Sequence, residues 1–72
     1  MSTGDQFVAK QYVRNPEENW TINMGDTLYL YEEVSNGSYV IGFNAFNNNT
    51  GEKMYLGGDD ILYLTDGYES WI

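Results

Sequence analysis

Two stretches of the chain alternate apolar and polar positions with the two-residue period of a β-strand. In residues 27–34 the leucines fall on one face, and Tyr29 and Tyr31 fall on the other. Residues 38–46 show a second alternation. Asn36-Gly37 lies between the two stretches, and this dipeptide favours a type I′ turn because Asn and Gly accept positive φ angles. The pattern therefore predicts a tight antiparallel hairpin.

Shorter β-prone runs surround this hairpin. They are residues 7–13, 53–56 and 61–64. In the long loop after the first run, Asn15-Pro16 followed by two glutamates predicts one helical or 3₁₀ turn. Gly42, in the middle of a predicted strand, predicts a bulge or a sharp bend.

Five short strands joined by one long loop, one tight hairpin and one moderate hairpin define an all-β class. We expect a single domain over residues 1–72, folded as a small five-stranded, closed or nearly closed barrel. A chain of this length buries only about 60% of the surface that its unfolded form exposes. It has no Cys and no His, so neither disulfides nor zinc can add stability, and packing of its 12 aromatic residues must close the core.

The charge is strongly and unevenly negative. Eleven acidic residues face three basic ones, which gives a net charge of −8, and Lys53 is the only basic residue after Arg14. Such a field repels phosphate backbones and anionic membranes and attracts basic surfaces. We therefore expect no direct binding to nucleic acid or membrane. No signal peptide or membrane-spanning run is recognisable, so we expect a cytoplasmic or virion-associated protein that is not secreted.

The region before the first long strand resembles SH3-like domains. The residues that carry this resemblance are Ile22, Asn23, Met24, Gly25, Asp26 and Leu28, an apolar residue and a Gly-Asp turn leading into a hydrophobic strand. Asn36-Gly37 falls where the family has its n-Src loop, and Thr50-Gly51-Glu52 resembles the distal turn. The resemblance covers roughly residues 7–64 and implies the barrel architecture.

The family's peptide pocket is largely missing from the aligned positions. Gly57 stands where the family has the pocket proline, and Asp60 stands where it has the pocket tyrosine. Tyr39 takes the place of the specificity tryptophan, and Tyr12 can replace one tyrosine of the first strand motif. Recognition of a proline-rich helix needs parallel aromatic ridges. A peptide-binding SH3 function therefore stays only an alternative, because the fold does not choose the function.

The candidate partner-binding residues are acidic or aromatic, the combination that steers an encounter with a basic surface and then supplies contact energy. They are Glu17, Glu18, Tyr29, Tyr31, Glu32, Glu33, Tyr39, Asp59, Asp60, Tyr68 and Trp71. Of Tyr29 and Tyr31, we expect one to be packed and one to be exposed. Tyr68 and Trp71 either plug the mouth of the barrel or anchor a partner.

The sequence has few of the residues that catalysis or metal binding requires. Without His or Cys there is no ordinary nucleophile–base pair, and no glycine-rich phosphate loop opens a helix. Asp59, Asp60 and Asp66 do not follow the EF-hand pattern, and Asp59 is better placed to cap the turn before the last strand. We predict no enzyme activity, no metal and no cofactor.

These observations favour a non-enzymatic acidic module that docks on a basic surface of a protein partner. In size and charge the chain looks like small accessory proteins of bacteriophages and mobile elements, some of which inhibit nucleic-acid-binding proteins as DNA mimics. The partner would then be a nucleic-acid-binding protein. The alternative is a structural subunit of a virion or other assembly that self-associates.

Overall fold

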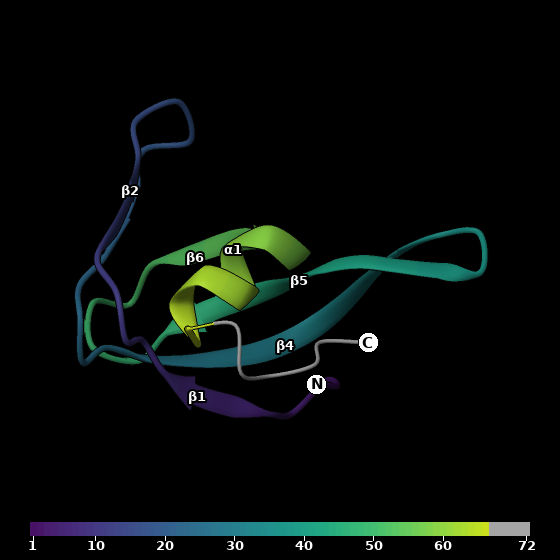
Figure 1. The fold of residues 1–72 in the computed structure, drawn as a ribbon, viewed down its shortest axis with the longest axis horizontal. Helices are drawn as coiled ribbons and strands as arrows, with labels where there is room; N and C mark the ends of the chain where they lie inside the picture. The colour runs from purple at the N-terminus through teal and green to yellow at the C-terminus, as the bar shows by residue number, and fades with distance from the viewer. Residues whose placement is uncertain (67–72) are drawn as a thin grey trace.

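The computed structural model describes residues 1–66, and half of them lie in β-strands (Figure 1). The strands are β1 (Gln6–Val8), β2 (Val13–Asn15), β3 (Trp20–Ile22), β4 (Thr27–Asn36), β5 (Tyr39–Asn47) and β6 (Lys53–Gly57), and they are followed by the helix α1 (Gly58–Leu64). The prediction of a β-dominated fold is confirmed. The expected end segment with Tyr68 and Trp71 lies outside the described residues.

The strands form two antiparallel sheets. The main sheet has the order β1-β4-β5-β6, and β2 and β3 form a separate hairpin that projects away from it (Figure 1). Within residues 1–66 the main sheet keeps two edges, β1 and β6, and does not close on itself. The predicted closure into a five-stranded barrel is therefore not confirmed by residues 1–66.

The segment predicted as the closing strand, residues 61–64, belongs to α1 and is helical. The Asp60 carboxylate accepts a hydrogen bond from the Gly57 N–H at 3.2 Å, and two aspartates in the first turn suit the positive end of the helix. Ile61 and Leu64, three residues apart, are both fully buried, which is helical spacing. The N-cap residue of this helix is Gly57, and Asp60, three residues later, bonds back to it; the expectation that Asp59 caps a turn before a last strand is therefore wrong.

The first predicted strand is divided between two sheets. Its start becomes β1, which pairs with β4, and its end becomes β2, which pairs with β3. The predicted helical turn at residues 15–18 is instead the tip of the β2–β3 hairpin, because Asn15 pairs directly with Trp20. The Asn15 side chain accepts a hydrogen bond from the Glu18 N–H at 3.1 Å, so Asn15 caps the turn without starting a helix.

The central hairpin is confirmed, with a turn shifted by one residue. Asn36 pairs with Tyr39, so the two turn residues are Gly37 and Ser38. Only Gly37 has a positive φ, of 66°, which is the pattern of a type II′ turn. The predicted type I′ turn, which needs positive φ at both Asn36 and Gly37, is therefore wrong, although Gly37 has the positive φ expected of it.

Two β-bulges interrupt the β4–β5 pairing and change the direction of side chains on this hairpin. Tyr31 has no partner on β5, and Ile41 has no partner on β4, so each strand carries one extra residue. The bulge predicted near Gly42 is thereby confirmed. A Cβ at Gly42 would lie 2.4 Å from the Leu56 carbonyl oxygen and 2.6 Å from the Tyr55 hydroxyl oxygen, so glycine is required there.

The core lies between the inner face of the main sheet, the β2–β3 hairpin and α1. Its buried hydrophobic residues are Ala9, Trp20, Ile22, Leu28, Leu30, Phe43, Ala45, Met54, Leu56, Ile61 and Leu64. Backbone hydrogen bonds fasten the outlying elements to it: the Ala9 N–H donates to the Asp26 carbonyl, and the Lys10 N–H donates to the Leu64 carbonyl, both at 2.8 Å. These bonds tie the segment before β2 to the turn before β4 and to the end of α1, while Trp20 and Ile22 anchor the hairpin in the core.

One buried polar pair joins two turns at the end of the sheet. Asn47 is fully buried, and its Nδ2 donates to the carboxylate of Asp26, itself 8% exposed, at 2.8 Å. The Asn47 Oδ1 accepts hydrogen bonds from the N–H groups of Asn49 and Thr50 at 2.9 and 3.3 Å. This side chain therefore connects the turn before β4 to the turn before β6.

Candidate functional site

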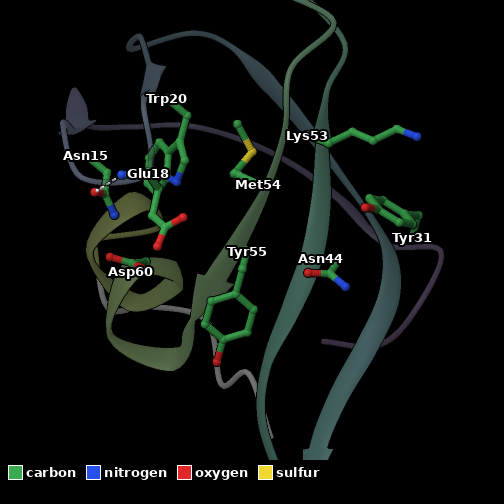
Figure 2. A pocket seen from close by; sticks show the side chains of 9 residues that line it. All are labelled: Asn15, Glu18, Trp20, Tyr31, Asn44, Lys53, Met54, Tyr55 and Asp60. Carbon is green, nitrogen blue, oxygen red and sulfur yellow. Dashed lines mark hydrogen bonds between the residues drawn. The ribbon is translucent and has the colours of Figure 1, made fainter.

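A groove of about 570 Å³ runs along the β6 edge of the main sheet and is the candidate functional site (Figure 2). It lies between the β2–β3 hairpin and the outer face of the sheet. Its lining residues are Asn15, Glu18, Trp20, Tyr31, Asn44, Lys53, Met54, Tyr55 and Asp60. We call this surface the edge groove.

The wall that the edge groove shares with the core is apolar. Trp20 from β3 and Met54 from β6 are each only 5% exposed, and both belong to the core cluster. They line the groove while being held by the packing of the core, so this wall is rigid. A rigid aromatic and thioether surface suits contact with apolar parts of a partner.

Two tyrosines line the groove on the outer face of the sheet, and the bulges of the central hairpin help to position them. Tyr31 is the extra residue of β4 and is 37% exposed, and Tyr55 of β6 is 43% exposed. The Tyr55 hydroxyl donates to the carbonyl oxygen of Ile41, the extra residue of β5, at 3.1 Å. Because Gly42 has no side chain, the Tyr55 ring can lie across β5.

Carboxylates line the hairpin and helix side of the groove. Glu18 comes from the hairpin tip and Asp60 from the first turn of α1, and Figure 2 shows both on the side of the groove where Trp20 lies. Among the residues that the structure describes, no ion pair neutralises either carboxylate. A cation that enters the groove would meet two acidic side chains, of which Asp60 also accepts the Gly57 N–H at the start of α1.

The single basic side chain of the groove is turned away from these carboxylates. The Lys53 Nζ lies 5.7 Å from the centre of the Tyr31 ring, which is cation–π distance. In Figure 2 the Lys53 chain extends toward Tyr31, on the side opposite Trp20. The groove is therefore divided into a cation-bearing end and an acidic end.

The structure brings four of the predicted site residues to the groove or next to it. Glu18, Tyr31 and Asp60 line it, and Glu32 accepts a hydrogen bond at 2.7 Å from the lining residue Asn44. Tyr29 lies farther along the outer face and is 36% exposed, nearly the same as Tyr31. The expectation that one of the two tyrosines is packed and the other exposed is therefore wrong.

The other predicted residues do not line the groove. Glu17 is exposed at the hairpin tip, and Glu33 and Tyr39 are exposed on the long arm formed by β4 and β5, where Tyr39 is 77% exposed. Asp59 is exposed beside a second, shallower hollow between α1 and the arm. The remaining two predicted residues, Tyr68 and Trp71, lie outside the described residues.

Sequence reasoning missed Trp20, Lys53 and Tyr55 as site residues. Tyr55 had a usable signal, because it alternates with Met54 and Leu56 and must therefore face away from the core. Trp20 gave no such signal, since it is buried and reaches the groove only because the hairpin folds beside β6.

Two further findings concern metals and membranes. Among residues 1–66, no three or more acidic side chains lie together in a way that would hold a metal ion. In the same part of the chain α1 is only seven residues long, and no described helix has the length and apolarity that a membrane span requires.

Comparison of the chain with protein-family models, with curated proteins and with solved structures finds no match. A functional proposal therefore rests on the groove itself.

Proposed function

We propose that this protein is a non-enzymatic acidic binding module that docks on a basic surface of a protein partner through the edge groove. The observation that carries the proposal is the combination of two carboxylates, Glu18 and Asp60, with the half-exposed rings of Tyr31 and Tyr55 in one groove. Charge would steer the encounter, and the rings would supply the desolvated contact area.

The charge of the whole chain supports the same proposal. From Asn15 to the C-terminus ten acidic residues face Lys53 alone, so the surface around the groove attracts cations over about a Debye length, roughly 10 Å at 0.1 M salt. A basic surface that normally binds phosphates has the complementary charge. We therefore infer that the partner is a nucleic-acid-binding protein and that docking inhibits or regulates it, as expected of a phage or mobile-element accessory protein.

The finer interpretation of the fold, an SH3-like small barrel, belongs to this proposal. It is supported by the way four strands are connected: a long first loop between β1 and β4, a tight hairpin to β5 and a moderate turn to β6. It is not supported by residues 61–64, which are helical. The binding proposal depends on the groove and not on closure of a barrel.

The test is a tagged pull-down from bacterial lysate, washed at low and then at high salt, with bound proteins identified by mass spectrometry. A double variant, Glu18→Gln with Asp60→Asn, removes both groove charges, and Asn at position 60 keeps an acceptor for the helix cap. The matched control, Glu33→Gln with Glu52→Gln, removes the same charge from residues outside the groove lining.

The proposal predicts that the wild type and the control capture a nucleic-acid-binding protein that high salt or added DNA releases, and that the groove variant does not. Capture that is equal for all three proteins would contradict the role of the groove. Recovery of only the protein itself, as a salt-resistant oligomer, would favour the structural-subunit function instead.

A further inference from the structure

Within residues 1–66, the β6 edge of the main sheet has backbone groups without a hydrogen-bond partner, and these groups face the edge groove. The Asn47 N–H donates to the Glu52 carbonyl at 2.8 Å, so these two residues form a hydrogen-bonded pair at the start of the β5–β6 ladder. Hydrogen-bonded pairs alternate with non-hydrogen-bonded ones in an antiparallel ladder. Met54 therefore directs its backbone toward β5, whereas Lys53 and Tyr55 direct theirs away from it.

The next residue of this outward-facing series shows the same geometry. Gly57, two positions after Tyr55, has its N–H bonded to the Asp60 carboxylate at 3.2 Å and not to β5. For Lys53 and Tyr55 no such bond exists, because within residues 1–66 no hydrogen bond reaches the backbone N–H or C=O of either residue. With respect to the described residues, the edge thus presents two donors and two acceptors, spaced two residues apart.

Proteins usually protect such an edge with a charged side chain, most often lysine. Lys53 is the residue in that position here, but its ammonium group lies over the Tyr31 ring on the outer face of the sheet. The opposite side of the groove is formed by the hairpin residues Asn15, Glu18 and Trp20. The edge is consequently open toward a groove that has an acidic far side.

We propose that the partner engages this site by adding an extended segment as a further strand on β6, paired with the backbone of Lys53 and Tyr55 and carrying lysine or arginine toward Glu18 and Asp60. This rests on the function proposed above and specifies its partner as an extended basic peptide segment. Strand addition supplies affinity through main-chain bonds, and the alternating side chains supply specificity.

Charge selects a basic occupant over a second copy of this chain. A second copy would bring its own net charge of −8 to a surface of the same sign. An extended conformation is favoured over a polyproline helix because a strand repeats its backbone donors and acceptors on one side every two residues, which matches the spacing from Lys53 to Tyr55. A polyproline helix has three residues per turn and does not match it.

The first experiment measures amide hydrogen exchange by NMR in the free, full-length protein. We expect the amides of Lys53 and Tyr55 to exchange fast and those of Met54 and Leu56 to exchange slowly, because only the latter pair are bonded to β5. Slow exchange at all four amides would overturn the inference, since the edge would then already be occupied, by the chain's own C-terminal residues or by another copy.

The second experiment adds a ten-residue peptide of alternating lysine and threonine. We expect the amides of Lys53 and Tyr55 to become protected from exchange. A peptide with the same side chains, but N-methylated at alternate residues, should bind about tenfold more weakly, since it cannot donate hydrogen bonds to the edge. Equal binding of the two peptides without protection would overturn strand addition while leaving the proposed function intact. Absence of binding by both would overturn the inference, and the pull-down described above then decides the proposed function separately.

A backbone variant of the protein tests the same pairing from the protein side. Lys53→Pro removes an N–H that the β5 ladder does not use, and proline is tolerated at such edge positions. Lys53→Gln removes the same charge and keeps the N–H, so it is the matched control. We expect the proline variant to bind the peptide about tenfold more weakly than the glutamine variant. Equal affinity of the two folded variants would contradict pairing at this residue.

Discussion

Replacing Asn47 by alanine is expected to remove a large part of the stability of this protein. Alanine deletes three hydrogen bonds of a fully buried side chain: one donated to the Asp26 carboxylate at 2.8 Å and two accepted from the N–H groups of Asn49 and Thr50. The backbone bonds of residue 47 are unaffected, because they do not involve its side chain.

The magnitude follows from the kind of bond that is lost. A hydrogen bond to a charged group contributes about 1.5–3 kcal/mol, and the two turn N–H groups, which are partly buried, contribute about 0.5 kcal/mol each once water replaces the amide oxygen. We expect a loss of about 3 kcal/mol. A 72-residue domain has roughly 4–11 kcal/mol in total, so the variant should fold with a Tm lower by about 12–24 °C.

Urea and thermal unfolding followed by circular dichroism measure this loss. The matched control is Asn48→Ala, because the Asn48 side chain is exposed and makes a single bond, to Gln6, at 3.3 Å, so it should cost less than about 0.5 kcal/mol. A second variant, Asn47→Asp, keeps the shape but loses the donor to Asp26 and should destabilise at least as much as alanine. A cost for Asn47→Ala below about 1 kcal/mol would refute the reasoning.

Two further predictions concern the sheet and the helix. Gly42→Ala should destabilise the protein by about 2–3 kcal/mol and change the fluorescence of Tyr55, because the new Cβ would meet the Leu56 carbonyl at 2.4 Å. Gly57→Ala is the control, because the nearest atoms to a Cβ there lie at 3.8 Å. Equal stability of the two variants in urea would contradict this prediction. In the same assay, Leu64→Ala should lower the free energy of unfolding by about 2–5 kcal/mol, because Leu64 is fully buried. Tyr63→Ala should lower it by less than about 1 kcal/mol, because the Tyr63 side chain is 55% exposed. The reverse order would indicate that this segment is not helical as described.

Much of the fold could be predicted from local patterns because its central hairpin is strongly alternating. The leucines of β4 and the glycine of the turn left little choice for residues 27–46, and Gly42 correctly marked an irregularity. Residues 61–64 were different. A four-residue apolar run has no period of its own, and the decisive information was the Asp60 cap on the Gly57 N–H, which is visible only in three dimensions.

The candidate site was less predictable than the fold. Glu18, Tyr31 and Asp60 were chosen for their chemistry, but nothing in the sequence places a hairpin tip, a β4 bulge and a helix start around one groove. That arrangement depends on long-range contacts, such as the packing of Trp20 in the core and the passage of Tyr55 across Gly42. Tyr29 and Tyr39 carry equivalent chemistry, yet they lie elsewhere on the surface.

The most direct test of the central claim is the affinity of the alternating lysine–threonine peptide for the wild-type protein. It is measured by isothermal titration calorimetry at low and high salt, and it is compared with the affinity for the double variant Glu18→Gln, Asp60→Asn. The account predicts saturable binding by the wild type that weakens as salt rises, and binding at least tenfold weaker in the variant. Binding of equal strength in both proteins, or no dependence on salt, would contradict the claim that this groove recognises a basic partner.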